Sequence, residues 1–309
     1  MSAEATTFLL PDGRTLAYSV YGSSREDTGY PLVFYFHSFP GCRLECALWE
    51  RSAQKLGLCL VAVDRPGMGL STFHENRTIG NWSDDILALA NHLHIQEFGV
   101  LGVSGGAPYV LACLKNIPCH RLKAAASVSG LYPCTLGTAG MTLKNRILLW
   151  VSPWAPNLVA KFMDLTLGWA ARDQAHPEKF TRRFKADLLG DNKPNVDLHC
   201  LQRVLDDPTL WVPVFESVRG SMSVSSRGNA WEAALFGWDW GFKLSDVEAR
   251  KLVIWHGALD ANVPVRMADK AAGMLRGARY ERLDEHAHCS LLFSHSEEIL
   301  ESLAEMMRR

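Results

Sequence analysis

The 309-residue sequence lacks a strong net charge, a long apolar run and paired cysteines. Its 32 basic residues nearly balance 33 acidic ones, and the formal charge of −1 excludes a global field that would attract nucleic acid or an anionic membrane. No run of eighteen apolar residues occurs, so we expect no membrane span. The eight cysteines show no C-x-x-C spacing, which argues against a disulfide scaffold and against a metal site of cysteine and histidine.

Targeting signals and low-complexity tracts are also missing from the sequence. The first residues, MSAEATTFLLPDGR, have no basic segment followed by an apolar one, so we expect a cytoplasmic protein with reduced thiols. What the sequence does contain is a hydrophobic fraction of 48%, which is enough to bury a large core. The expected partner is a neutral or apolar small molecule, and we leave a homodimer open as the assembly.

Strand and helix patterns alternate along the first 132 residues. Residues 6–22 are typical of a β-hairpin with Pro, Asp and Gly at its turn. Unbroken apolar stretches follow, as expected for parallel strands that helices cover on both faces. Apolar residues at helical spacing predict helices near 43–56, 81–93 and 107–116. The stretches predicted as strands are 31–37, 58–64, 98–104 and 122–130.

The pattern changes between residues 133 and 247. This segment has no clear strand, shows several helical patterns and holds seven of the ten tryptophans. Alternation then resumes, with strands predicted at 251–257 and 279–284 and helices near 265–275 and 296–307. An aromatic insertion in such a sheet is typical of a lid over the carboxyl ends of the strands. The predicted parts are an α/β core of 1–132 and 248–309 and a helical cap of 133–247.

The segment FGVLGVSGGAPY carries the strongest chemical signal. It places G-x-S-x-G between a predicted strand and a predicted helix, the context in which this motif presents a nucleophilic serine, here Ser104. The flanking glycines allow close backbone approach while the serine occupies a strained turn. We expect the helix to begin at the serine, so that its dipole faces developing negative charge.

A serine needs a base, and the base needs an orienting acid. Asp260 follows the strand at 251–257, and His286 and His288 follow the last strand. The order Ser, Asp, His is the order that a doubly wound hydrolase uses. Each residue has a simpler interpretation as well, because Asp260 suits a helix cap and either histidine suits the surface.

At this point the sequence resembles the α/β-hydrolase superfamily, in particular hydrolases whose first motif reads H-G-x-P-G-S-R-L-E. Ser38 and Cys42 replace the Gly and Ser of that motif. The resemblance implies a mostly parallel eight-stranded sheet flanked by helices, with the helical lid inserted after the sixth strand. The matching segments are HSFPGCRLE (37–45), DRPGMGLST (64–72), GVSGGAPY (102–109), HGALDANVP (256–264) and DEHAHCSLL (284–292).

Residue by residue, the resemblance implies Ser104 as nucleophile, Asp260 as orienting acid and His288 as base. His286 falls where the family has Gly, so His288 is preferred. An oxyanion hole requires two donors, and these are expected to be the backbone N–H groups of Gly105 and Phe39.

We expect different roles for His37 and Ser38, the two residues that precede Phe39. His37 suits a structural role, bonded to neighbouring loops, better than a catalytic one. The side chain of Ser38, where the family has Gly, is expected either to shift the Phe39 N–H or to add a polar contact beside the substrate.

Together these residues predict a serine hydrolase that cleaves an ester, lactone or thioester of a hydrophobic small molecule through an acyl-enzyme, with no metal and no cofactor. Relatives with Asp as nucleophile, the epoxide hydrolases and haloalkane dehalogenases, do not fit Ser104. The alternatives are an acyltransferase, a C–C bond hydrolase or cyclase on a polyketide-like substrate, and a non-catalytic ligand-binding receptor.

The substrate pocket is the least determined part of the prediction. We expect His37, Ser38, Trp150 and Trp154 to line it, as part of a dry aromatic pocket. The tryptophans could equally fill the core of the insertion. Residues 146–159 could also form a membrane-surface patch, although interruption by proline and a single arginine make this the weaker interpretation.

Overall fold

A computed structural model describes residues 4–23, 31–190 and 193–308. Its centre is one eight-stranded sheet with the order β1-β2-β4-β3-β5-β6-β7-β8. The pairings β1 with β2 and β2 with β4 are antiparallel, and all others are parallel. The strands are β1 (Thr6–Leu9), β2 (Thr15–Gly22), β3 (Leu32–Phe36), β4 (Cys59–Val63), β5 (Phe98–Val103), β6 (Leu122–Val128), β7 (Leu252–Gly257) and β8 (Arg279–Leu283). The predicted mostly parallel sheet of eight strands is confirmed.

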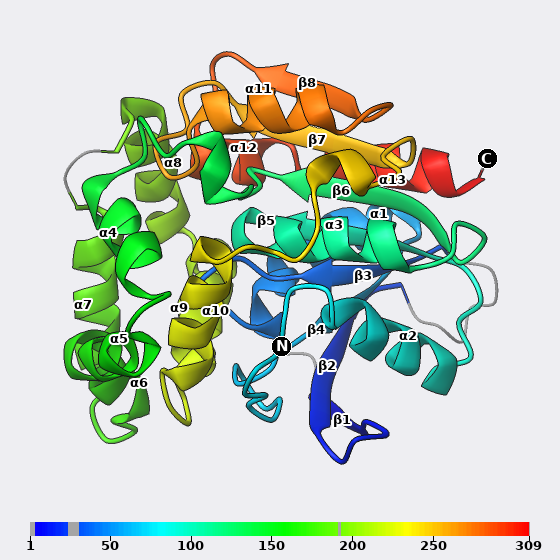
Figure 1. The fold of residues 1–309 in the computed structure, drawn as a ribbon. Helices are drawn as coiled ribbons and strands as arrows, with labels where there is room; N and C mark the ends of the chain where they lie inside the picture. The colour runs from blue at the N-terminus through cyan, green and yellow to red at the C-terminus, as the bar shows by residue number, and fades with distance from the viewer. Residues whose placement is uncertain (1–3, 24–30, 191–192, 309) are drawn as a thin grey trace.

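Helices cover both faces of the sheet, as Figure 1 shows. Phe34 and Phe36 of β3 pack with α2, α3 and α11 on one face, while Val33 and Tyr35 pack with η1, α1, α12 and α13 on the other. Every residue of β3, β4 and β5 is buried, which explains why these strands are continuous apolar runs. The core helices are η1 (Arg43–Trp49), α1 (Glu50–Leu56), α2 (Trp82–His92), η2 (Ser104–Gly106), α3 (Ala107–Asn116), α11 (Val265–Met274), α12 (His288–Ser294) and α13 (Ser296–Arg308).

The segment 133–247, called the insertion below, contains helices and connecting turns and no strand among its described residues. It follows β6, the sixth strand, and lies to one side of the sheet (Figure 1). No described helix of the chain is long and apolar enough to cross a bilayer. The helices of the insertion are η3 (Cys134–Leu136), α4 (Leu143–Val151), α5 (Pro156–Met163), the π turn η4 (Asp164–Gly168), α6 (Trp169–Arg172), α7 (Pro177–Leu188), α8 (Asn195–Asp206), α9 (Pro208–Ser221), α10 (Arg227–Gly237) and η5 (Leu244–Asp246).

Candidate active site

Ser104 occupies the sharp turn after β5, with a φ of 51° in the left-handed region. A Cβ on Gly102 would lie 2.6 Å from the carbonyl oxygen of Gly106, and a Cβ on Gly106 would lie 2.3 Å from that of Phe36. Close backbone approach therefore requires both glycines of G-x-S-x-G. A helical turn does begin at the serine, as the 3-10 helix η2 over Ser104–Gly106, and the α-helix α3 continues from Ala107.

Ser104, His288 and Asp260 form one hydrogen-bonded chain. Nδ1 of His288 lies 2.7 Å from Oδ2 of Asp260, and Nε2 of His288 lies 3.1 Å from Oγ of Ser104. An ionised carboxylate only accepts, so Nδ1 carries the proton and Nε2 accepts from the Ser104 hydroxyl. The sheet brings these residues together because β5, β7 and β8 end at the same edge.

The Asp260 carboxylate is divided between two tasks. Its Oδ1 accepts the backbone N–H groups of Asn262 and Val263, both at 2.8 Å, while its Oδ2 faces His288. Asp260 thus caps backbone N–H groups and also bonds to His288, so the two interpretations of this residue are compatible. The capped element is a turn and not the helix α11. Since the carboxylate is buried and fixed by the backbone, it can hold the imidazole in one orientation.

Two opposing effects act on the pKa of His288. Burial of His288 opposes its charged form, but the charge of Asp260 and its hydrogen bond outweigh that effect, so the pKa of His288 lies above its ordinary value. His286, the other histidine of this loop, contacts a different group: its Nε2 lies 3.0 Å from Nε2 of His295. Of the two histidines, His288 is the one that the structure joins to Ser104 and Asp260.

The loop after β3 meets the turn that carries Ser104. A Cβ on Gly105 would lie 2.7 Å from Cβ of Phe39 and 3.0 Å from the ring of Phe236. Phe39 and Phe236 also form an edge-to-face pair, with ring centroids 5.5 Å apart. The two residues expected to supply the oxyanion donors, Phe39 and Gly105, are therefore neighbours beside Ser104.

His37 is buried and bonded on both ring nitrogens. Its Nδ1 lies 2.8 Å from the Ser38 carbonyl oxygen, and its Nε2 accepts the N–H of Arg65 at 3.3 Å. Burial, and then the charge of Arg65, hold the pKa of His37 well below its ordinary value, so the ring stays neutral. This placement matches the structural role expected for His37.

Ser38 is bonded to a buried carboxylate, and its expected role beside the substrate stays a prediction. Its N–H donates to Oε1 of Glu45 at 2.9 Å, and its hydroxyl donates to Oε2 of the same carboxylate. Glu45 is buried, and burial raises its pKa even though the bonds from Ser38 and Tyr35 oppose that shift. The extra hydroxyl at position 38 therefore serves a buried carboxylate.

A buried ion pair fixes the same loop, and sequence reasoning did not identify it. The guanidinium of Arg65 donates to the carbonyl oxygens of His37 and Ser38, at 2.6 and 3.1 Å, and binds Glu232 of α10 with Nε and Nη2. Tyr109 donates to the same carboxylate at 2.7 Å. Arg65 was visible in the DRPG motif, but nothing in the sequence around Glu232 marks it as the partner.

A second residue of the insertion contacts the histidine loop. Oδ1 of Asp197 in α8 accepts the N–H groups of Cys289 and Ser290, at 3.0 and 2.8 Å. These groups belong to the first turn of α12, which begins at His288. A carboxylate satisfies the open donors at such a helix start, so Asp197 fixes the turn that carries His288. No sequence signal singled out Asp197.

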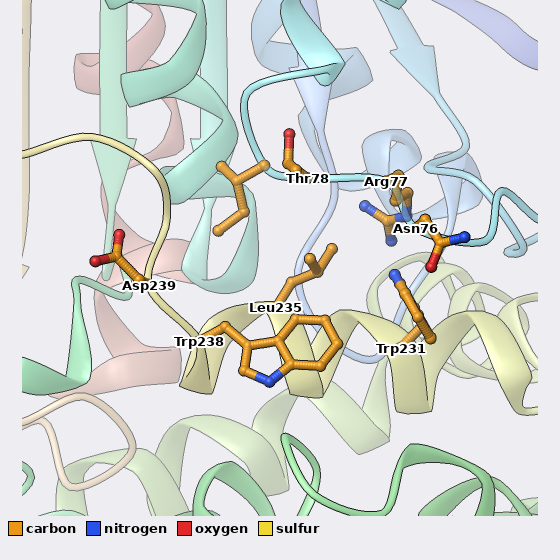
Figure 2. Close-up of a pocket in the computed structure, with 8 residues that line it drawn as sticks. Asn76, Arg77, Thr78, Trp231, Leu235, Trp238 and Asp239 are labelled. Atoms are coloured by element: carbon orange, nitrogen blue, oxygen red, sulfur yellow. The ribbon is translucent and has the colours of Figure 1, made fainter.

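Trp150 and Trp154 lie on the surface of the insertion, with 73% and 83% of their surface exposed. Their expected pocket role stays a prediction, and this exposure gives it no support. A pocket of about 230 Å³ opens elsewhere, between the loop at 76–79 and α10, where Trp231 and Trp238 line it (Figure 2). The three residues of the hydrogen-bonded chain are not among its lining residues. Within the described ranges, no three His, Cys, Asp or Glu side chains are grouped to hold a metal ion.

Similarity to known proteins indicates the family to which the chain belongs. Residues 32–302 match the family model described as "Alpha/beta hydrolase family". A search of curated proteins finds no match. Solved structures share the fold over nearly the whole chain. An alpha/beta hydrolase fold protein from Nakamurella multipartita has 19% identity and a TM-score of 0.66, with 99% of each chain covered.

An esterase from Exiguobacterium antarcticum is 17% identical, with a TM-score of 0.62 over 98% of this chain and 99% of its own. An enol-lactonase from Burkholderia xenovorans is 15% identical, with a TM-score of 0.64 over 98% and 100%. Identities this low show a shared fold and nothing about the substrate. The family match, in contrast, spans most of the sequence, and the chain belongs to the alpha/beta hydrolase family.

Proposed function

We propose that the protein is a serine hydrolase that cleaves an ester, lactone or thioester of a hydrophobic small molecule through an acyl-enzyme. The observation that carries the proposal is the hydrogen-bonded chain from Ser104 through His288 to Asp260. Solved structures with this fold include an esterase and an enol-lactonase, so the fold is compatible with this class of substrate. Phe39 and Phe236 place apolar surface beside Ser104, which suits a hydrophobic acyl or alcohol group.

In the acylation step, Oγ of Ser104 attacks the substrate carbonyl carbon while Nε2 of His288 takes the hydroxyl proton. Asp260 stabilises the imidazolium that forms. The tetrahedral intermediate places a negative charge on the former carbonyl oxygen, and the N–H groups of Gly105 and Phe39 are the donors proposed to bind it. When the intermediate collapses, His288 gives its proton to the leaving alcohol or thiol, and the acyl group stays on Ser104.

In the deacylation step, His288 removes a proton from a water molecule that attacks the acyl carbon. The second intermediate collapses, the acid product leaves, and the proton returns to Oγ of Ser104. Each step balances with water as the only co-reactant, so the residues of the chain suffice for hydrolysis.

A fluorophosphonate probe tests the activated serine directly. We expect the wild-type protein to be labelled, Ser104→Ala to lose all labelling, and Ser223→Ala, a matched change at an exposed serine, to label like wild type. Turnover of p-nitrophenyl esters and of a thioester then measures acyl preference. An unlabelled wild-type protein, or labelling of Ser104→Ala at the wild-type level, would show that Ser104 is not the nucleophile.

A further inference from the structure

The insertion exposes a row of large apolar side chains along α4, the turn after it, α5 and η4. They follow one another at intervals of three or four residues, two on α4, one in the turn after it, and three on α5 and η4. Isolated exposed apolar residues are common, but a continuous aromatic and aliphatic row is typical of an interaction surface. The members of this apolar stripe are Ile147, Trp150, Trp154, Leu158, Phe162 and Leu165, which are 51% to 83% exposed.

The opposite side of the same helices already has a partner. Leu148, Val151 and Met163 pack around a small core that includes Val159 of α5 and Ala230 of α10. Figure 1 places α4, α5 and α6 outside α10, on the side away from the sheet. The apolar stripe is therefore the outer face of a pair of helices whose inner face holds them to the protein.

The segment that carries the stripe has an excess of basic residues. Residues 143–187 contain eight Lys or Arg and four Asp or Glu, and three of the basic side chains form ion pairs within the segment, in a chain with a formal charge of −1. Arg146, Lys161, Arg182 and Lys185 are exposed within this segment. The local field is thus opposite in sign to the charge of the remaining chain, which whole-chain composition conceals.

We propose that the apolar stripe docks the protein on the surface of an anionic lipid bilayer. Trp and Phe side chains partition into the interfacial region of a bilayer, and flanking Lys and Arg bind anionic head groups. The charge decides between this occupant and a second copy of the chain, because stripe-to-stripe pairing would bring two positive rims together. The two prolines of this segment lie outside the helix interiors, because Pro153 stands in the turn between α4 and α5 and Pro156 is the first residue of α5.

Vesicle flotation tests the proposal with the whole protein. We expect the protein to float with vesicles of phosphatidylcholine containing about 30% phosphatidylglycerol, and to float much less with pure phosphatidylcholine. Raising the salt from about 0.05 M to about 0.5 M should weaken binding, because screening removes the charge contribution. Binding that is equal on both kinds of vesicle, or absent from both, overturns the proposal.

Variants locate the surface. The pair Trp154→Ser and Phe162→Ser, and separately the pair Arg146→Glu and Lys161→Glu, should each weaken binding by about ten-fold or more. The matched controls are Leu9→Ser and Val224→Ser, at 68% and 79% exposed apolar residues outside the stripe, which should bind like wild type. Equal loss in the controls, or no loss in the stripe variants, contradicts the assignment.

Two further measurements separate this proposal from its rivals. Sedimentation of the free protein should give a monomer; a dimer that Trp154→Ser dissociates would assign the stripe to a second copy instead. Ser104→Ala should float like wild type, because docking does not use the hydrogen-bonded chain. Failure of the serine hydrolase proposal would therefore leave the docking result intact, and the reverse also holds.

Discussion

At the residue scale, the site depends on glycines at which an added Cβ atom would clash with neighbouring atoms. Gly106 has the closest approach around Ser104, because an added Cβ would lie 2.3 Å from the Phe36 carbonyl oxygen. That oxygen belongs to β3 and cannot move without shifting the strand. The glycines of the G-x-S-x-G motif are therefore needed because they leave room for neighbouring backbone, and not because they make the chain flexible.

We predict that Gly106→Ala lowers the free energy of unfolding by about 2 kcal/mol and sharply reduces ester turnover, because β3 and the serine turn must separate. Thermal unfolding and steady-state kinetics measure the two effects. The matched control is Gly273→Ala on α11, where an added Cβ meets nothing within 4 Å and should stabilise the helix by about 0.5–1 kcal/mol. Normal turnover in Gly106→Ala would contradict the packing argument.

The raised pKa of His288 predicts the pH dependence of the reaction. His288 must be neutral to accept the serine proton, so kcat/KM should fall as the pH drops through the pKa of His288, at a pH above that of an ordinary histidine. Asp260→Asn removes the charge that raises this pKa. We expect the acidic limb to move to lower pH and kcat to fall by about 10³–10⁴-fold.

The pH–rate profile of both proteins tests this expectation, with Asp187→Asn, an exposed aspartate of α7, as the control. An acidic limb that does not move in Asp260→Asn would mean that another group limits the rate at low pH.

Ser38→Gly restores the residue that the family motif has at this position. We expect activity within a few-fold of wild type, because the hydroxyl is bound to Glu45 and not directed at Ser104. Stability should fall by about 1 kcal/mol, since a buried carboxylate loses one donor. Ester kinetics and thermal unfolding check both statements, and a collapse of kcat would assign the hydroxyl a direct role.

At the element scale, α10 positions the oxyanion loop from outside the core. Glu232 binds the guanidinium of Arg65, and that guanidinium donates to the carbonyl oxygens of His37 and Ser38, the two residues before Phe39. Arg65 and Glu232 are both fully buried, so neither charge has water as an alternative partner. We regard Glu232 as a positioning residue for the Phe39 N–H.

We predict that Glu232→Gln lowers stability by about 3 kcal/mol and lowers kcat by about ten-fold with a smaller change in KM. The split follows because the oxyanion donor acts on the transition state more than on substrate binding. Glu178→Gln, an exposed change on α7, is the control. A purely structural role would lower the amount of folded protein and leave kcat per folded molecule unchanged, which active-site titration distinguishes.

At the scale of the whole molecule, the insertion is fixed to the core next to both loops that the proposed mechanism uses. Glu232 reaches the loop after β3 through Arg65, Asp197 reaches the start of α12, and Ser217 of α9 accepts the N–H of Cys42 at 2.8 Å. Movement of the insertion would therefore act on both the oxyanion loop and the histidine turn. The insertion is thus bonded to both loops.

The cysteines predict the response of the whole fold to reductant. No disulfide joins any two of the eight, all of which lie in the described ranges, and five of them are buried. Burial raises the pKa of thiols such as Cys113 and Cys46, so these react slowly. We expect dithiothreitol to leave Tm unchanged and thiol reagents to label Cys119, which is exposed, first. A lower Tm in reductant would contradict this structure.

Much of the fold and the central chain of the site followed from local sequence patterns. The apolar runs gave the parallel strands because strands buried on both faces need no polar alternation. G-x-S-x-G, followed by Asp260 and His288 after two later strands, predicted residues that the structure places within hydrogen-bonding distance. These signals are readable because each depends on a few neighbouring residues and on chain order.

What only the tertiary structure decided is which distant residues share a buried site and which faces stay open. Arg65 and Glu232 are 167 positions apart, and nothing local to either identifies the other as the counter-ion. Asp197 lies 93 positions from the Ser290 N–H that it accepts. Trp150 and Trp154 are of a residue type that commonly lines pockets. The packing of α4 and α5 on α10 nevertheless leaves both side chains exposed. Burial and exposure are properties of packed pairs of elements, so they are fixed only when the chain folds.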